Sequence, residues 1–213
     1  MTARTEDPYH HGDLRETLLR DALQEIAAAG TEKLSLRALA RRAGVSPTAP
    51  YRHFPSKRCL LAALITRGFR LLDESISAAR KAAGSDLESQ LVAMSLAYVR
   101  FAQHNPTYYE LMFSTVLEDF SEYEDLQQAA EASYGVLLSA LEDLVAARPG
   151  LDISASELSA VVWSAVHGVA SLLLFSHGRA PAKGRGDPLT GLELLAEDPE
   201  RGIRLLLRGV LSA

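Results

Sequence analysis

The sequence contains a single cysteine, Cys59, among its 213 residues. One thiol excludes a disulfide framework within the chain and a zinc site built from several thiolates. The opening residues also lack the pattern of a secretory signal, because acids and polar residues stand where a basic end and an apolar run would be needed. Nothing here requires an oxidising compartment, and we therefore expect a cytoplasmic protein.

Motifs of common catalytic sites are missing as well. The sequence has no glycine-rich phosphate loop, no nucleophile elbow and no obvious activating partner for Cys59. His104 and His167 are conceivable metal ligands, but neither has a second ligand three or four residues away. We therefore expect no catalytic residues, no metal and no cofactor. Acid–base chemistry by His104 and Glu110 is the alternative, and turnover of a bound small molecule would revive it.

Charge is distributed unevenly along the chain. The formal net charge is -5, yet the stretch from Leu34 to Arg70 contains no acidic residue. Its cations are Arg37, Arg41, Arg42, Arg52, Lys57, Arg58, Arg67 and Arg70. Clustered Lys and Arg supply most non-specific DNA affinity by neutralising phosphates. The asymmetry indicates a polyanion-binding segment attached to an acidic remainder, although a solvated basic face would have the same composition.

Apolar residues recur at helical spacing, and alternating strand patterns are scarce. The sequence therefore predicts an all-α fold of about nine helices, over residues 12–29, 36–43, 47–54, 57–83, 87–104, 106–114, 123–147, 155–177 and 199–211. Residues that can cap helix starts precede several of them, namely Ser35, Ser46, Ser56, Asn105 and Ser154. The Gly- and Pro-rich stretch over residues 178–198 is predicted to be a loop.

Residues 36–54, LRALARRAGVSPTAPYRHF, have the pattern of a helix-turn-helix. The first helix has an apolar face, Gly44 allows the positive φ of a tight turn, and Val45 fills the angle between the helices. Tyr51 and Phe54 are spaced to pack at least partly inward. Pro50 lies in or just beyond the first turn of the second helix, so we expect that helix to be short or tightened.

The second helix of such a motif lies in the DNA major groove, where its first residues reach base edges. Thr48, Ala49 and Arg52 are the candidates for base contact, and Tyr51, His53 and Lys57 for phosphate contact. Helix starts also hold phosphates, which adds four further candidates for DNA binding: Ser35, Arg37, Ser46 and Pro47.

The run from Leu36 through PYRHFPSK to Leu61 closely resembles the signature of the TetR (tetracycline-repressor) family of transcriptional regulators. In that signature YxHF is followed by a short turn and a lysine, and Tyr51, His53, Phe54, Ser56 and Lys57 match it position by position. The resemblance covers about residues 13–64. The opening HHGDLR and the later VVWSAVHG at residues 161–168 further resemble the subgroup named for a Trp-His-Gly motif.

This resemblance implies a DNA-binding domain over residues 10–57 and a ligand-binding and dimerisation domain over residues 58–213. It implies a repressor that binds a palindromic operator as a homodimer and is released by a small-molecule effector. The alternative is a helical protein-interaction module without a DNA role. Salt-dependent binding of duplex DNA distinguishes the two, because a dimer that contacts phosphates must bind more weakly as the salt concentration rises.

Aromatic residues are concentrated in the second half of the chain and suggest an apolar pocket for an apolar or aromatic effector. The candidates are Phe69, Tyr98, Phe101, Tyr108, Met112, Phe113, Tyr134, Trp163 and His167. Ordinary core packing is the alternative for each of them singly. By resemblance to the family, the pocket would be enclosed mainly by the fourth to eighth predicted helices.

Residues 158–175 carry no charge and approach the length of a membrane span. Polar interruptions such as Ser164 and His167, and the lack of a basic flank before Arg179, lead us to expect no membrane insertion. We expect a dimer interface instead, as in the family that the chain resembles. Its predicted residues are Ala160, Ser164, Gly168 and Ser171 on one helix, and Ile203, Leu206, Leu207 and Val210 on the last.

Overall fold

The computed structural model describes residues 11–117, 119–176 and 188–211, and all regular secondary structure in this part of the chain is helical. The all-α prediction is therefore confirmed. The described elements are α1 (His11–Ala29), η1 (Thr31–Lys33), α2 (Leu36–Arg42), η2 (Ala49–Arg52), α3 (Lys57–Ala82), α4 (Leu87–His104), α5 (Pro106–Met112), α6 (Glu124–Ala147), α7 (Ala155–Ser176), α8 (Pro188–Glu197) and α9 (Pro199–Leu211), where η marks a 3-10 helix.

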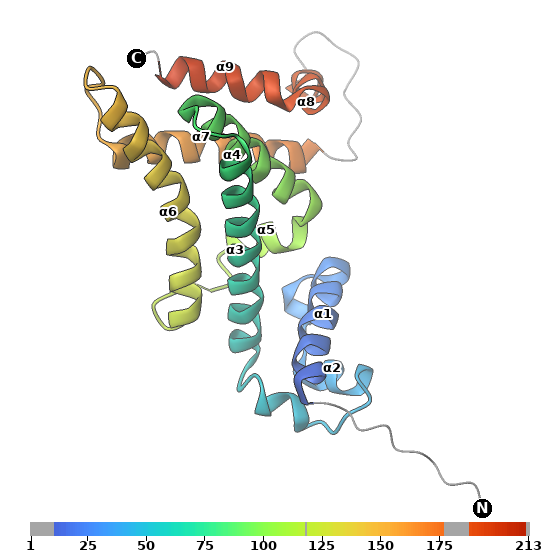
Figure 1. The fold of residues 1–213 in the computed structure, drawn as a ribbon. Helices are drawn as coiled ribbons and strands as arrows, with labels where there is room; N and C mark the ends of the chain where they lie inside the picture. Colours follow the sequence, from blue (N-terminus) through green and yellow to red (C-terminus); the bar gives the residue numbers. More distant parts are fainter. Residues whose placement is uncertain (1–10, 118, 177–187, 212–213) are drawn as a thin grey trace, which may run out of the picture.

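The longest helix, α3, runs through the whole molecule (Figure 1). Ser56 caps its start by accepting a hydrogen bond from the backbone N–H of Cys59 at 3.1 Å. Its apolar residues repeat at three- and four-residue spacing and are buried from Leu60 to Ile76. One side of α3 packs against α4 and α6, and its N-terminal half also contacts α1. A single helix thus links the two ends of the fold.

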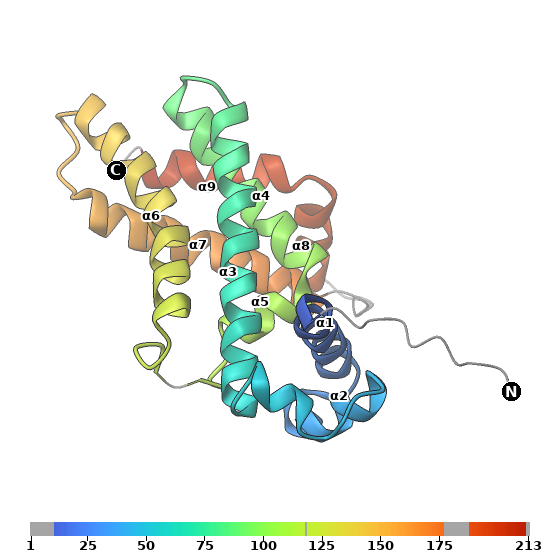
Figure 2. The ribbon, with the colours of Figure 1, turned by 60° about the horizontal axis from the view of Figure 1, so that its bottom comes forward.

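The small N-terminal unit consists of α1, η1, α2 and η2 at one end of the molecule (Figure 2). The turn after α2 has Gly44 at φ 70, as the sequence predicted. The N–H of Val45 donates to the carbonyl of Ala40 at 3.0 Å, and that of Gly44 to Arg41 at 3.2 Å. This pair of bonds is a Schellman motif, which ends a helix with a residue in the left-handed region.

The second helix of the motif is shorter than the predicted range of 47–54 and is a 3-10 helix, as the position of Pro50 led us to expect. Pro50 has no N–H to donate, and the segment closes with three-residue bonds such as Tyr51 N–H to Thr48 O at 3.2 Å. Phe54 packs inward as predicted, whereas Tyr51 remains 43% exposed.

The prediction of a loop over residues 178–198 is wrong for its second half, because α8 occupies Pro188–Glu197. Proline stands at the first helical position, and Leu192 and Leu195 lie half-buried at helical spacing. A side chain at Gly202 would collide with Leu195, so this glycine allows α8 to lie close against α9. The remaining loop residues, 178–187, lie outside the described part of the chain.

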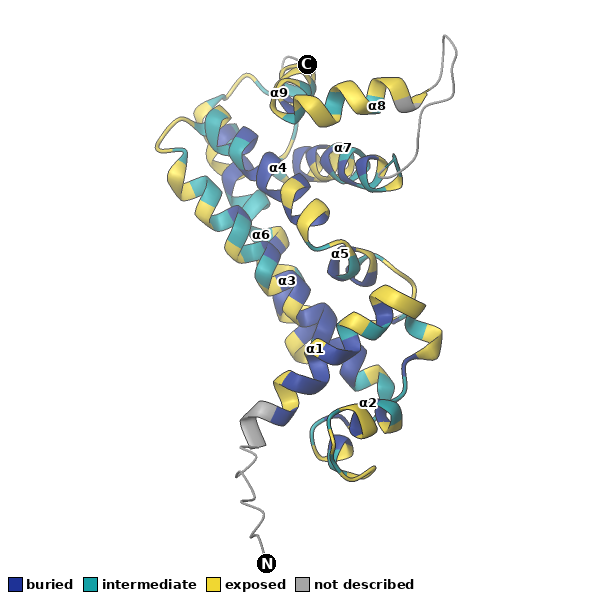
Figure 3. Cartoon of the chain, turned by 90° about the vertical axis from the view of Figure 1, so that its right-hand side faces the viewer, coloured by how far each residue is buried: buried dark blue, intermediate teal, exposed yellow. Residues whose placement is uncertain are grey.

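In the larger unit, α4, α5 and α6 pack against α3, and α7 packs against α4 and α6. Helices α8 and α9 lie at the end remote from α1 and α2 (Figures 1 and 3). The capping box predicted at Ser154 is present, with Glu157 N–H donating to Ser154 Oγ at 3.2 Å and Ser154 N–H to Glu157 Oε2 at 3.1 Å. Ser35 and Asn105 make no side-chain cap, and Asn105 instead donates to the carbonyl of Phe101.

Replacing Leu64 with Ala should destabilise the protein by about 2–5 kcal/mol, because Leu64 is fully buried in α3 and its removal leaves a cavity. The matched change Leu205→Ala, at a side chain that is 73% exposed, should change the stability by less than about 0.5 kcal/mol. Urea unfolding at one fixed protein concentration measures both. Equal losses for the two variants would contradict the assignment of α3 to the core.

Candidate nucleic-acid interface and ligand cavity

The helix-turn-helix presents one exposed face. The predicted DNA-binding residues with exposed side chains are Arg37, Ser46, Pro47, Thr48, Tyr51 and Arg52, and the half-buried ones are Ser35, Ala49, His53 and Lys57. The inner face of the same segment is buried, with Leu36, Leu39 and Phe54 in the core. None of the predicted residues is enclosed by the fold, so the whole set can meet a flat or grooved partner.

Acidic side chains from elsewhere in the chain neutralise half of the basic run. Four ion pairs do this: Arg42 with Asp21 at 3.8 Å, Arg58 with Glu122 at 3.7 Å, Arg67 with Glu16 at 2.6 Å and Arg70 with Asp125 at 3.9 Å. Among the described residues, Arg37, Arg41 and Arg52 have no acidic partner. The net positive surface is therefore confined to α2 and η2, rather than extending along α3.

Lys57 has a structural contact that the sequence did not predict. Its Nζ donates to the carbonyl of Glu32 in η1 at 3.3 Å, which fastens the start of α3 to the connection between α1 and α2. An ammonium has three donors, so this bond leaves two for another acceptor. The predicted phosphate contact is compatible with this position.

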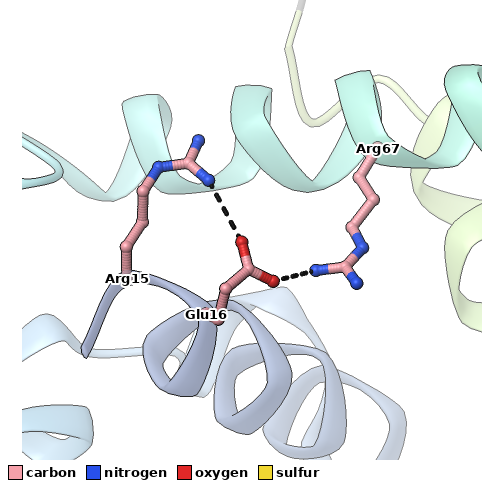
Figure 4. Close-up of polar contacts among 3 residues, drawn as sticks. All are labelled: Arg15, Glu16 and Arg67. Carbon is pink, nitrogen blue, oxygen red and sulfur yellow. Dashed lines mark hydrogen bonds and ion pairs between the residues drawn. The ribbon is translucent and has the colours of Figure 1, made fainter. Parts of the chain in front are cut away.

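A second contact joins α1 to α3 farther along (Figure 4). Glu16 accepts from Arg67 at 2.6 Å and lies 3.4 Å from Arg15, whose guanidinium is 5.4 Å from the centre of the Phe54 ring. The hydrogen bond with Glu16 raises the pKa of Arg67. Because both side chains of the Glu16–Arg67 pair are about half exposed, solvent limits its contribution to stability. The pair joins the first half of α1 to the middle of α3.

A cavity of 290 Å³ lies between α3, α5, α6 and α7. Six of the predicted pocket residues line it, namely Phe69, Tyr98, Met112, Phe113, Tyr134 and Trp163, together with Leu72, Ile76, Phe120, Ala130, Ser133 and Leu137. A smaller space of 40 Å³ adjoins it and shares Ile76, Tyr98, Leu137 and Trp163. The aliphatic lining was missed because it looks like core; Leu72 and Ile76 follow Phe69 at helical spacing, which is the signal that could have found them.

Three predicted pocket residues do not line this cavity. Phe101 and Tyr108 are buried in the packing of α4 and α5. His167 is not a lining residue but contacts two that are, Phe113 and Trp163. Tyr108 packs beside Gly68, at which an added Cβ would lie 2.7 Å from the sulfur of Met112. Burial raises the pKa of the Tyr108 phenol. For Phe101 and Tyr108, the geometry favours the alternative, ordinary core packing.

His167 is the centre of a hydrogen-bonded network. Its Nδ1 lies 2.9 Å from the hydroxyls of both Tyr98 and Tyr109, and Tyr109 also reaches Ser171 Oγ at 3.0 Å. Burial lowers the pKa of His167 and raises those of both phenols, so the neutral forms are favoured. One imidazole nitrogen can accept a hydrogen bond from only one of the two hydroxyls, and Tyr109 has two other acceptors, namely Ser171 Oγ and the His167 carbonyl at 3.3 Å.

Among the predicted dimer residues of α7, Gly168 borders open space in the described part of the chain, because an added Cβ there would meet nothing within 4 Å. Ser171 instead reaches inward, where its Oγ lies 3.0 Å from the hydroxyl of Tyr109 on α5. Ala160 and Ser164 are exposed, and Gly168 and Ser171 are half-buried. For α9 the prediction is wrong at Ile203 and Leu207, which are 0% and 3% exposed. They pack inside the subunit, where α9 contacts α4, and have no surface left for a partner. Leu206 and Val210 are half-buried.

By length and composition alone, α7 is apolar enough to cross a membrane, with 33% of its most apolar window buried in the fold. Its buried residues, among them Val162, Val166 and Ala170, form the side of the helix that packs within the subunit, where α7 contacts α4 and α6. This side of α7 is therefore part of the core of the subunit. Within residues 11–117, 119–176 and 188–211, no three His, Cys, Asp or Glu side chains are grouped closely enough to hold a metal ion.

Two family profiles match the sequence. One, described as "Bacterial regulatory proteins, tetR family", matches residues 18–64, and the other, "Tetracyclin repressor-like, C-terminal domain", matches residues 91–189. The HTH-type transcriptional regulator YobS of Bacillus subtilis (strain 168) is 33% identical over 99 residues, which are 46% of this chain and 50% of that protein. The matched region thus spans about half the length of this relative.

Solved structures share the architecture. A protein of unknown function from Rhodococcus sp. RHA1 is 32% identical, with a TM-score of 0.73 over 92% of this chain and 98% of that chain. The TetR family transcriptional regulator PfmR from Thermus thermophilus is 19% identical, with a TM-score of 0.65 over 90% of this chain and 97% of that chain, and shows the fold alone. The Trp-His-Gly subgroup remains a prediction.

The stability of the folded chain should fall as the pH is lowered through the ordinary pKa of histidine, 6.5. The unfolded chain takes up a proton on His167 there, whereas the folded chain keeps it neutral until a lower pH, so the unfolded state binds more protons. His167→Asn places an amide oxygen near Nδ1 and removes this titration. Thermal unfolding midpoints between about pH 5 and pH 7.5 should therefore depend less on pH in the variant. Parallel curves for the two proteins would contradict this role.

Proposed function

The chain belongs to the TetR family of bacterial transcriptional regulators, and from that premise we propose that a homodimer of it binds a near-palindromic operator and releases it when a small molecule fills the cavity. The observation that carries this proposal is the double attachment of α3. Near its start, α3 is bonded to the helix-turn-helix unit through Lys57 and Arg67. Farther along, the same helix supplies Phe69, Leu72 and Ile76 to the cavity wall.

Filling the cavity would release DNA through the position of α3. A two-fold dimer sets its recognition elements about 34 Å apart, one turn of DNA, so that both enter the major groove together. A ligand that pushes on Phe69, Leu72 or Ile76 tilts α3 and carries the helix-turn-helix with it. When the spacing no longer matches one turn, operator affinity falls by a coupling free energy of about 1–3 kcal/mol. We therefore propose a repressor relieved by its effector.

The exposed face of η2 and the preceding turn supports the DNA contacts. Thr48, Ala49 and Arg52 are proposed to read bases, because short side chains allow close approach and a guanidinium pairs with guanine. Tyr51, His53 and Lys57 are proposed to contact phosphates, together with Ser35, Arg37, Ser46 and Pro47 near the helix starts. A 3-10 helix of four residues offers a narrower reading surface than an α-helix of two turns, so we expect few direct base contacts.

The proposed dimer interface is the uncovered face of α7 with its neighbour α8. Large apolar side chains are exposed on both helices, including Leu172 and Phe175 on α7 and Leu194 on α8. Exposed apolar patches of this kind mark protein interfaces. On α9, Ile203 and Leu207 face inward, and we therefore propose that α8 supplies the part of the interface that the sequence assigned to these two residues. The division into a DNA-binding domain over residues 10–57 and a second domain over residues 58–213 is kept as part of this proposal.

Selection of bound duplexes from random DNA tests the proposed function and supplies the operator. Arg52→Ala should then weaken binding of the selected duplex by about 1–3 kcal/mol and relax the preference at one position, since a base contact is lost. Lys57→Ala should weaken all duplexes alike and lower the slope of log K against log salt by about one. Fluorescence anisotropy across a salt series measures both changes.

Arg201→Ala is the control, because Arg201 is an exposed cation of α9 at the far end of the molecule. It should leave the duplex affinity unchanged. The recovered site should be near-palindromic. Duplex binding that is independent of salt, or that Arg52→Ala leaves intact, would contradict the proposed interface and favour a protein-interaction module.

Gly168→Gln should weaken the dimer by at least about tenfold, because a side chain at this position keeps a second helix from close approach. Gly135→Gln in α6 is the matched control, since an added Cβ meets nothing within 4 Å at either glycine. Sedimentation velocity over a range of protein concentrations measures the monomer–dimer equilibrium. An unchanged equilibrium in Gly168→Gln, or an equal change in both variants, would place the interface elsewhere.

A further inference from the structure

Two largely buried serines line the two adjoining spaces. Ser133 on α6 lines the larger space and Ser95 on α4 the smaller one, and each residue is 5% exposed. Neither hydroxyl has a hydrogen-bond partner in the described part of the chain. In that same part, every fully buried side-chain oxygen or nitrogen does have one. The two hydroxyl oxygens are therefore open to space, and the space that both residues line is the cavity.

A ligand that covers these hydroxyls without hydrogen-bonding to them would be disfavoured, because burying a hydroxyl without a partner is costly. The other cavity hydroxyls are already engaged: Tyr98 pairs with His167 at 2.9 Å, and Tyr134 with Ser159 at 2.6 Å. The polar groups left for a ligand are thus two serine hydroxyls, each able to donate and to accept. A ligand that hydrogen-bonds to both serines would bind more tightly than one that only fills the cavity.

The cavity also lacks charge. No Asp, Glu, Lys, Arg or His is among the described residues that line either space. A buried ion without a partner is strongly disfavoured, so the ligand must be neutral at the pH of binding. Aromatic and aliphatic side chains make up the rest of the wall, which favours flat apolar rings.

The volume sets the size of the ligand. A cavity of about 150 Å³ lined by apolar side chains is known to hold benzene. The larger space here measures 290 Å³, nearly twice that volume, which suits two fused rings. Its exposed lining residues, Tyr134 and Trp163, form an edge-to-face pair with ring centres 6.3 Å apart and mark the entrance between α6 and α7.

We propose that the effector is a neutral two-ring aromatic molecule with two uncharged polar substituents that hydrogen-bond to Ser95 and Ser133. This inference rests on the proposed function of the cavity as the effector site. It goes further in assigning the two serines as specificity-determining residues and in excluding carboxylate and ammonium ligands.

Four probes of one ring system separate the contributions: naphthalene, naphthol, naphthalenediol and naphthoate, each titrated calorimetrically into the full-length protein. The diol should bind most tightly, and naphthoate about 100-fold more weakly than the diol. Ser133→Ala and Ser95→Ala should each weaken the binding of the diol by about 3- to 10-fold and leave the affinity for naphthalene unchanged. Ser139→Ala, on α6 but outside the cavity, should alter none of the four. Ala130→Leu, which fills the cavity, should weaken all neutral probes.

Some outcomes would overturn the proposal. They are naphthoate binding as tightly as the diol, serine substitutions that weaken naphthalene and the diol equally, and no binding of any probe. Anisotropy of the selected duplex, measured with and without the diol, separates this inference from the proposed function. If the diol binds as expected but the duplex stays bound, the ligand class stands and effector release fails. If the duplex is bound and the diol is not, the ligand class alone fails.

Discussion

The structure depends on one constraint: α3 must be apolar enough to serve the core and polar enough at its edges to hold the helix-turn-helix unit. From Leu60 to Ile76 its buried stripe is continuous, so the helix cannot rotate without exposing core residues. Its polar attachments lie on the flank of this stripe, with Lys57 bonded to Glu32 and Arg67 to Glu16. A rigid stripe with light polar attachments favours tilting of α3 as a unit over local unfolding.

Ion pairs explain why the charge of the sequence predicts a larger basic surface than the structure has. All charged residues between Leu34 and Arg70 are basic, yet three arginines of α3 and Arg42 of α2 pair with acids of α1 and of the segment around the start of α6. Acids distant in sequence fold back onto the run, which no count along the chain can reveal. What remains uncompensated is confined to the exposed face of α2 and η2. A narrower positive surface places more of any DNA affinity on Arg37, Arg41 and Arg52.

Turns and several helix caps could be predicted from neighbouring residues. The predictions that failed are those that depend on contacts between residues distant in sequence. Gly44, Ser56 and the Ser154–Glu157 pair act as the sequence indicated because turns and caps involve only neighbouring residues. The sequence also indicates the apolar stripe of α9. Helical spacing alone, however, does not distinguish a stripe that packs inside the subunit from one that packs against a second subunit. Similarly, glycine and proline before Pro188 concealed a short helix whose stability comes from packing on α7 and α9. Only part of the cavity lining could be predicted, because clustered aromatic residues suggest a pocket whereas aliphatic residues are typical of any core.

The contacts of α5 indicate how a filled cavity would act on α3. Met112 lines the cavity, and the missing side chain at Gly68 lets its sulfur lie against the backbone of α3. Arg67, the neighbour of Gly68, holds Glu16 of α1. On the same short helix, Tyr109 is anchored to α7 through His167 and Ser171. Because the middle of α5 is anchored in this way, a ligand that presses on Met112 pushes against α3 at Gly68, one residue from the bond of Arg67 to the DNA-binding unit.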